Sequence, residues 1–326
     1  MRTILRINLI ISAVLFLSNV CYSDVGTTTG YLLEASTGAR AAGRGESFVA
    51  ASDINSIYYN PAGLGFLSSS EVSLMYTKGG VDTNYEYLAG VLPIKNIGVF
   101  GLSVFAFQGG TIDVVDSLDN STTKNAEVDF LISLAYSKEV LLRGLSLGIT
   151  NKYLFSTLVD EYRAGTYTFD LGALYRLDEI SIGVSVSNII GGLKYFETLD
   201  KLPLLIRGGA EYLLNISEDN EICISGDILS SSKLKVFVGV EYIYQKFLCG
   251  RLGYRMGDNG LTLGLGYKLN LSDDMSGSFD YAFLPGNDLS FSHRVSLNIY
   301  FGEVLQQYVS PKKKDKVPGV PGRVIQ

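Results

Sequence analysis

Most of this chain consists of segments of about ten residues in which apolar and polar side chains alternate strictly. In the segment 261–269, four leucines and Tyr267 alternate with Thr262, two glycines and Lys268. A period of two places all apolar side chains on one face of a β-strand. A tilted strand of about ten residues is long enough to cross a bilayer. Repetition of such segments between turns is typical of a transmembrane β-barrel.

The pattern predicts an all-β protein, a transmembrane antiparallel β-barrel of about 14 strands, the even number that returns both barrel ends to the same side. Short turns at 93–96, 177–179 and 245–246 are expected at the periplasmic rim, and the long loops 108–125 and 189–202 on the outside. The expected strands are centred near 71–76, 84–92, 97–107, 126–137, 144–154, 165–176, 180–188, 203–214, 221–228, 234–243, 247–256, 260–269, 275–284 and 290–301.

The N-terminus has the pattern of an export signal. Two arginines precede a largely apolar run over 7–20, which is too short to cross a membrane as a helix. Residues 1–23 are therefore predicted to be a cleaved signal peptide. The alternative is a lipoprotein acylated at Cys21, although residues 18–20 fit a lipid-attachment motif poorly.

Composition excludes several classes of protein. A net charge of −6 without a basic stripe disfavours a nucleic-acid partner. The chain has no tryptophan but 21 tyrosines, so tyrosine and phenylalanine must form the aromatic belts that barrels place at both interfaces. A soluble propeller or sandwich is the rival all-β fold. It is disfavoured because no blade-length repeat occurs and because sandwich strands are usually shorter.

Residues for catalysis or metal binding are scarce. The one histidine, His293, lies at an outward position of the last strand. No Gly-x-Ser-x-Gly elbow or phosphate-binding glycine loop occurs, so neither an enzyme nor a cofactor or metal site is expected. Cys223 and Cys249 are separated by a whole strand, which places them about 9–10 Å apart. This distance is too long for a disulfide, so two free buried thiols are expected.

Charged residues on the polar face of the strands are expected to face the lumen, because Arg or Lys at the lipid midplane costs about 2–4 kcal/mol. Their signs are nearly balanced. This balance favours ion pairs that brace the barrel or hold a plug over an ion-selective pore, with ligand lining as the alternative for some of them. The set is Asp129, Asp170, Arg207, Glu211, Glu241, Arg251, Arg255, Lys268, Asp280 and Arg294.

The segment 24–66, called the hatch below, lacks the strand alternation. Small residues and two arginines fill 38–45, a helix is expected over 46–57, and Asn60 and Pro61 are suited to capping a helical turn. Small residues let a backbone lie close to a wall, which suits a plug in the lumen. The barrel is then expected to occupy 67–302. The lysine- and proline-containing tail, 303–326, is expected to be disordered and periplasmic.

Motifs at both ends of the mature chain resemble the PorV/PorQ family, within the wider FadL-like superfamily of long-chain fatty-acid transporters. The matching stretches are 38–43, 48–50, Asp53, 59–64, 239–242, 252–255, 260–267, 280–283 and 293–297. The resemblance implies a fourteen-stranded barrel in the bacterial outer membrane with its hatch in the lumen. The chain has Tyr59 and Arg44 where the family often has Trp and Met. The hatch motif residues are Gly38, Arg40, Gly43, Arg44, Asn60, Pro61, Ala62 and Gly63.

Three functions are consistent with this resemblance. FadL-like members move hydrophobic molecules into the barrel and out sideways, which predicts a fatty-acid-like ligand or lipid in a pocket lined by Phe48, Ile54 and Leu64. PorV-like members are partners of the type IX secretion system, which predicts binding of secretion-system proteins through the long loops or the tail. A mainly structural barrel is the third. The lipid bilayer is the partner in all three, and uptake of hydrophobic small molecules is the leading expectation.

Overall fold

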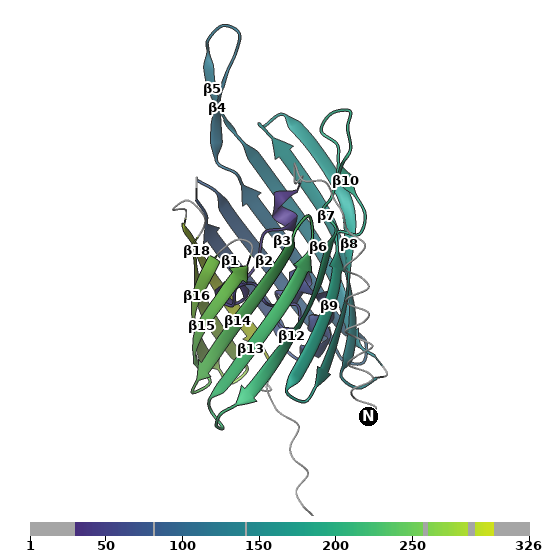
Figure 1. Ribbon diagram of the computed structural model, residues 1–326, viewed down its shortest axis with the longest axis vertical. Helices are drawn as coiled ribbons and strands as arrows, with labels where there is room; N and C mark the ends of the chain where they lie inside the picture. Colours follow the sequence, from purple (N-terminus) through teal and green to yellow (C-terminus); the bar gives the residue numbers. More distant parts are fainter. Residues whose placement is uncertain (1–29, 81, 141, 257–259, 286–290, 303–326) are drawn as a thin grey trace, which may run out of the picture.

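The computed structural model describes residues 30–80, 82–140, 142–256, 260–285 and 291–302. Within them, fourteen antiparallel strands form a closed barrel, in which β1 pairs with β18 (Figure 1). The predicted fold class is confirmed. The expected signal peptide and C-terminal tail lie outside the described residues.

The barrel strands follow one another in sequence around the wall, and their bounds agree with the predicted segments to within a few residues. They are β1 (Ser70–Lys78), β2 (Asn84–Ile94), β3 (Gly98–Gln108), β6 (Glu127–Glu139), β7 (Leu145–Leu158), β8 (Tyr162–Leu177), β9 (Ile180–Ser187), β12 (Leu205–Asn215), β13 (Glu221–Ser230), β14 (Leu234–Tyr244), β15 (Leu248–Met256), β16 (Gly260–Ser272), β17 (Met275–Pro285) and β18 (Phe291–Phe301).

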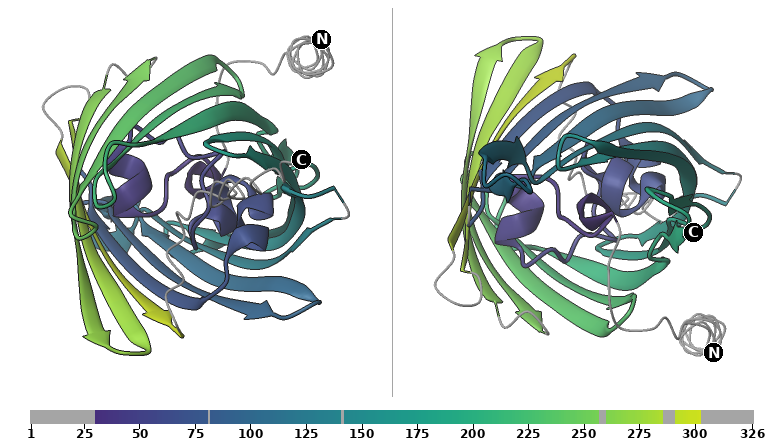
Figure 2. Two further views of the ribbon diagram at one scale, coloured as in Figure 1. Left: turned by 90° about the horizontal axis from the view of Figure 1, so that it is seen from below. Right: turned by 90° about the horizontal axis from the view of Figure 1, so that it is seen from above.

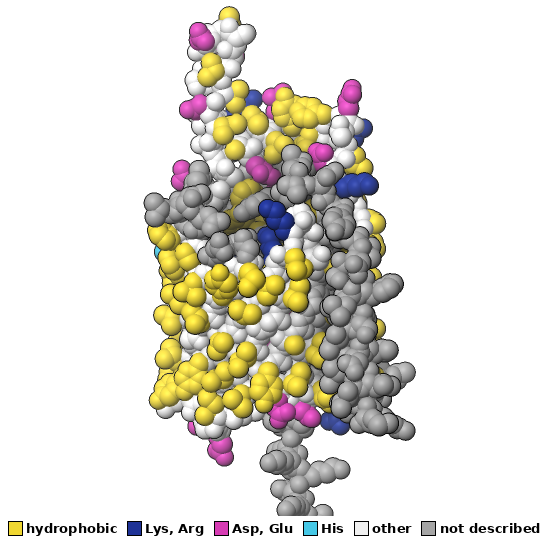
Figure 3. Space-filling model, viewed as in Figure 1, with side chains coloured by type: hydrophobic (Ala, Val, Ile, Leu, Met, Phe, Trp, Pro, Cys, Tyr) yellow, Lys and Arg dark blue, Asp and Glu magenta, His cyan; other side chains and the backbone are white. Residues whose placement is uncertain are grey.

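The outer wall is apolar because the alternating side chains of each strand separate onto two faces. On β16, Leu261, Leu263 and Leu265 are exposed on the outside, whereas Thr262 is fully buried in the lumen. Figure 3 shows this apolar surface spread over the barrel wall. An apolar belt on a closed barrel is built to face lipid. Among the described residues, no helix is long and apolar enough to cross a membrane.

Two small ribbons lie at one end of the barrel, which the long loops mark as the outer end. β4 (Thr111–Val115) and β5 (Ser121–Asn125) form a hairpin that projects far beyond the rim (Figure 1). β10 (Gly192–Leu193) and β11 (Asp200–Lys201) pair within the loop between β9 and β12. Both segments were predicted only as loops. Short turns join the strands at the opposite, periplasmic end.

The described part of the hatch, residues 30–66, lies inside the barrel (Figure 2). Its elements are short: η1 (Tyr31–Leu33), α2 (Ala39–Gly43), α3 (Ser56–Tyr59) and η2 (Pro61–Phe66). The helix predicted over 46–57 is wrong, because only its last two residues are helical and 46–55 are irregular. Hydrogen bonds to the wall, described below, replace those of a helix in this stretch.

The lumen has an apolar half and a charged half. The apolar half is one buried cluster, built on hatch residues such as Ile57 and Leu64 and on inward residues of β1, β2, β3, β6 and β7. We call it the apolar cluster: Leu32, Leu33, Ile54, Ile57, Leu64, Leu67, Met75, Tyr87, Ala89, Val91, Val99, Phe105, Phe107, Leu131, Ala135, Leu154, Ala164, Leu193 and Leu202. The charged half lies against β12 to β17 and holds the ion pairs of Arg40, Arg44 and Arg251. The buried Lys152–Asp170 pair and Asp129 lie outside it, on β6 to β8.

Candidate functional site

Wall glycines provide the space in which the hatch backbone lies. A β-carbon on any of these glycines would lie 3.0 Å or less from a hatch atom, which is tighter than nine in ten real β-carbon contacts. Each of the eight lies on a different strand, so the hatch is fitted to the wall over more than half of its circumference. In the described chain they are Gly101, Gly148, Gly172, Gly183, Gly209, Gly239, Gly253 and Gly264.

In the charged half, Glu241 on β14 is the centre of an ion-pair network between hatch and wall. Its buried carboxylate accepts hydrogen bonds from Arg40 Nη2 at 2.8 Å and from Arg251 Nε at 2.7 Å. A third guanidinium, that of Arg44, lies 3.7 Å away. Three arginines therefore share one carboxylate, and two of them belong to the hatch.

Further acids complete this network. Arg44 Nη2 lies 2.5 Å from Glu211, and Arg251 Nη1 lies 2.7 Å from Asp280. Arg40 also pairs with Asp53 of the hatch at 3.3 Å. The pairs of Arg40 and Arg44 with Glu241 and Glu211 join hatch and wall, and the pairs of Arg251 join wall strands. Sequence reasoning did not identify which acid pairs with Arg44.

Burial and the arginines have opposite effects on the two hatch carboxylates. Burial disfavours the charged form of Glu46, but the guanidinium groups of Arg255, Arg294 and Arg207 outweigh it and lower the pKa of Glu46. At Asp53, burial is the stronger effect and raises the pKa of the carboxyl, although Arg40 opposes it.

Asp227 on β13 fixes the irregular part of the hatch and was missed from the sequence. Its carboxylate accepts the backbone N–H groups of Phe48 and Val49 at 2.8 and 2.9 Å, and the Ser47 hydroxyl at 3.2 Å. Two backbone donors are thus satisfied by the wall rather than by a helix. The available signal was strand parity, because Asp227 shares the inward face of β13 with Cys223.

Asn60 anchors the second half of the hatch. Its side chain accepts the Ala62 N–H at 3.2 Å and caps η2, and Pro61 is the first residue of that helix, as the sequence predicted. The Asn60 amide also donates to Val49 O at 2.7 Å and to Ala173 O of β8 at 3.2 Å. One side chain therefore ties two hatch segments to the wall.

The glycines of the hatch motif let the hatch backbone pack closely against neighbouring residues. Gly38 precedes α2 with a φ of 75°, and a side chain there would collide with Asn55. Gly43 lies against Gly264 of β16, and its carbonyl accepts a hydrogen bond from Thr262 at 3.2 Å. Gly63 is packed against Ser56, which leaves no room for a β-carbon.

Other lumen charges also have partners. Asp170 pairs with Lys152 at 2.5 Å, Arg207 with Asp227 at 3.5 Å, and Arg255 with Glu46 at 3.2 Å. Arg294 donates to the hydroxyls of Thr77 and Ser36. Asp129 is fully buried on β6, whereas Lys268, although at an inward position, is exposed near the periplasmic end.

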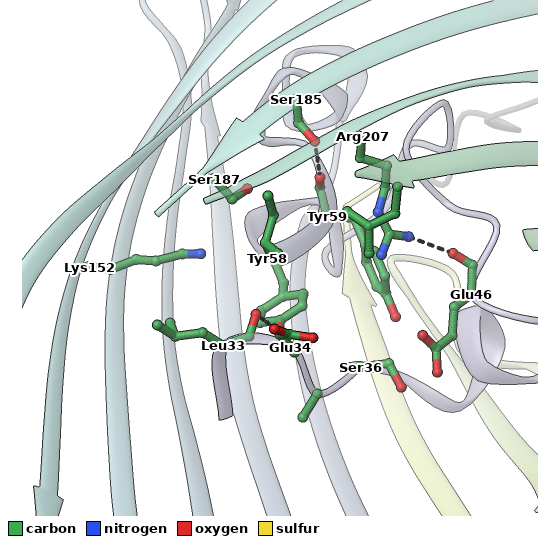
Figure 4. Close-up of a pocket in the computed structure, with 13 residues that line it drawn as sticks. Leu33, Glu34, Ser36, Glu46, Tyr58, Tyr59, Lys152, Ser185, Ser187 and Arg207 are labelled. Atoms are coloured by element: carbon green, nitrogen blue, oxygen red, sulfur yellow. Dashed lines mark hydrogen bonds between the residues drawn. The ribbon is translucent and has the colours of Figure 1, made fainter. Parts of the chain in front are cut away.

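The proposed ligand-lining residues are buried but do not lie together. Phe48 packs against Ala41, Ala51 and Tyr59, beneath the guanidinium groups of the hatch arginines. Ile54 and Leu64 belong to the apolar cluster instead. None of the three lines the cavity in Figure 4, which lies between hatch and wall.

This cavity is small, and both charged and apolar side chains line it. Its volume of about 30 Å³ is roughly the space of one water molecule. Lys152 and Arg207 extend toward Tyr58 and Tyr59 from the wall, and Glu34 and Glu46 approach from the hatch (Figure 4). Arg207 donates to the Glu46 carbonyl at 2.8 Å. Cys223 and Cys249 are free and buried, as predicted, and no cluster of metal-binding side chains occurs in the described residues.

No protein-family model matches the chain, and no curated protein is significantly similar to it in sequence. Solved structures do match. The monoaromatic hydrocarbon channel CymD aligns with a TM-score of 0.58 at 12% identity, covering 82% of this chain and 97% of that chain. The toluene transporter TbuX of Ralstonia pickettii gives 0.56 at 13%, covering 82% and 98%. A FadL homologue of Pseudomonas aeruginosa gives 0.52 at 11%, with the same two coverages.

The fold is FadL-like. At 11–13% identity the likeness shows the fold, and the match covers 97–98% of each neighbour's chain. Together with the closed barrel and its apolar outer belt, it places the protein in the bacterial outer membrane.

Proposed function

We propose that the protein carries hydrophobic small molecules across the outer membrane. The observation that carries this proposal is the match of the whole barrel to hydrocarbon channels and transporters, which covers 97–98% of their chains. The assignment to the PorV/PorQ family within this superfamily rests on the sequence motifs alone.

The two-sided lumen supports the proposal. The apolar cluster extends from Leu193 and Leu202 of the outer loop to Val91 and Val99 near the periplasmic end. It is rich in aromatic contacts, such as Tyr87 with Phe105 at 5.7 Å. A hydrophobic molecule would find apolar neighbours along this half, whereas the charged half holds the hatch in place.

The outer wall has a matching feature. A shallow apolar depression lies over β1, β2 and β3, where Gly90 leaves room between Val72, Leu92, Phe100 and Leu102. It faces lipid on the outside of the wall that carries the apolar cluster on the inside. Sideways release of a hydrophobic molecule into the membrane is therefore proposed for this part of the wall.

Uptake measurements test the proposal. Cells that lack their own hydrocarbon transporters and express this barrel are expected to take up radiolabelled oleate or toluene faster than cells with an empty vector. Phe105→Glu places a charge in the apolar half and is expected to lower the initial rate about ten-fold or more, since a buried unpaired charge repels apolar ligands. Leu118→Glu, at the exposed hairpin tip, is the control and should leave the rate unchanged.

Failure of the wild-type barrel to raise uptake of either probe would refute transport of these molecules. A folded Phe105→Glu barrel, identified by its heat-modifiable migration on gels, is required in the comparison. Equal uptake by that variant and by the wild type would show that the apolar half is not the route.

A secretion-partner function, as in PorV-like barrels, is the second candidate. The hairpin β4–β5 favours it, because it projects from the outer end with Ile112, Val115 and Leu118 exposed. Exposed strand edges and apolar side chains are typical of surfaces that bind other proteins. A deletion of 111–125 that keeps uptake but releases a co-purifying outer-membrane protein would favour this function.

A further inference from the structure

The loop between β9 and β12, residues 188–204, closes over the outer end of the apolar half. Part of this loop is buried: Leu193 and Leu202 are 0% and 7% exposed and belong to the apolar cluster. Tyr195 packs against the same cluster. The charged Lys194 and Glu197 of the loop remain exposed. Leu193, Leu202 and Tyr195 thus lie on the lumen side of the loop, whereas Lys194 and Glu197 are exposed together with the apolar Ile190, Phe196 and Leu199.

The neck of this loop is held closed. The Asn188 N–H donates to Asp170 at 2.9 Å, and the Asn188 side chain donates to the Pro203 carbonyl at 3.0 Å. Within the loop, the Leu202 N–H donates to Gly191 O at 3.2 Å. The two ends of the loop are therefore fixed beside each other, which is the geometry of a flap attached at one edge.

Leu202 fills a space between the hatch and the wall. A β-carbon placed on Gly30 would lie 3.3 Å from Leu33 Cδ1 of the hatch, 3.3 Å from Leu154 Cδ2 of β7 and 3.7 Å from Leu202 Cδ2. Three leucines from three parts of the chain thus converge at one point. An apolar ligand that entered here would exchange one apolar contact for another when it displaced Leu202.

Tyr195 bonds the tip of the loop to the barrel, in addition to the Gly192 N–H, which donates to Thr166 Oγ1 of β8 at 3.2 Å. Tyr195 Oη and Ser156 Oγ of β7 lie 2.6 Å apart, and Ser156 is fully buried. Burial raises the pKa of Tyr195 to about 12. A tyrosine hydroxyl is protonated at physiological pH even without this shift, so Tyr195 can act as the donor. Ser156 lies opposite Asp129 in the β6–β7 register, so the latch is made on the polar rim of the apolar half.

We propose that residues 188–204 form a lid whose Leu193 and Leu202 occupy the entrance site for hydrophobic ligands, and that the Tyr195–Ser156 bond keeps the lid closed. The lid admits an apolar molecule when this bond opens. The inference rests on the proposed transport of hydrophobic small molecules and identifies where such a molecule enters the lumen.

Hydrogen exchange tests the lid itself. In the purified full-length barrel in mild detergent, Tyr195→Phe and Ser156→Ala are each expected to speed exchange of the amides in 189–202 about five-fold, the typical effect of one hydrogen bond. The double variant should show no further increase, because both changes remove the same bond. Tyr167→Phe, a mostly exposed tyrosine on the neighbouring strand, is the control. Unchanged exchange, or additive effects in the double variant, would overturn the latch.

Uptake of oleate and toluene by cells expressing the same variants tests the entrance. Both latch variants, and also Leu202→Ala, are expected to raise the initial rate, and Tyr167→Phe to leave it unchanged. In one outcome, the wild type takes up the probes while the latch variants change only hydrogen exchange and not the uptake rate. That result would overturn the proposed entrance site but not the proposed transport. If exchange responds but no protein takes up either probe, the entrance role fails together with the proposed transport.

Discussion

Replacing Glu241 by glutamine is expected to lower the free energy of unfolding by about 3–5 kcal/mol, the effect of removing one partner from a buried ion pair. The effect is large because the Glu241 carboxylate neutralises several arginines at once. Arg40, Arg44 and Arg251 all face this carboxylate, and a neutral amide leaves buried positive charge without compensation. Urea unfolding of the barrel in lipid vesicles, followed by heat-modifiable migration on gels, measures the change.

Asp219→Asn is the matched control for this experiment. Asp219 forms an ion pair with Lys246 at 3.2 Å, but both side chains are largely exposed at the periplasmic turns. Loss of such a pair changes stability by about 0–1 kcal/mol. Equal effects of the two substitutions would show that the network around Glu241 does not hold the hatch.

Gly253→Val is expected to unseat the hatch and open the pore. A side chain at Gly253 would enter the space of the Gly45 backbone, and neither backbone can move easily. Overpacking of this kind costs about 1–3 kcal/mol, which corresponds to a roughly 5- to 150-fold shift between the seated and unseated hatch. Single-channel conductance in planar bilayers, and sensitivity of cells to a large polar antibiotic, would both rise.

Gly250→Val on the same strand provides the control. Gly250 points to the other face of β15, and no atom lies within 4 Å of the β-carbon that it would carry. This variant should conduct like the wild type. A Gly253→Val barrel that is folded and equally closed would show that the pore is sealed by something other than the seated hatch.

Most of the fold could be predicted from the alternation of apolar and polar residues, because lipid on one side of the wall requires apolar side chains at every second position. Lipid covers the outward positions, so they are apolar on every strand, as at Leu265, which is 63% exposed. Each strand therefore shows its two faces in its composition. The hairpin β4–β5 does not meet this condition. It stands in solvent, and its strands are short: Thr111–Val115 alternates over only four residues, and Ser121–Asn125 has no apolar side chain.

The site was less predictable because its contacts join distant residues. Asn60 and Pro61 have a local role in capping a turn, and the sequence was sufficient to predict it. The conformation of 46–55 depends on Asp227, nearly 180 residues away, and no local pattern reports such a bond. The burial of Leu193 and Leu202 was missed for the same reason, since their partners belong to the hatch and to β7.

The long separation of these contacts also constrains the order in which the molecule assembles. Ala39 bonds to Ser296 across 257 residues, Gly43 to Thr262 across 219 and Arg40 to Glu241 across 201. The hatch is the first of these parts to be synthesised, yet its partners lie on the last strands of the wall. Ala39, Arg40 and Gly43 therefore lack these partners until β14 to β18 are in place, and late steps of this kind are slow because distant segments must meet. A periplasmic protease that cleaves only the N-terminal segment of barrels whose insertion has stalled would report this waiting period directly.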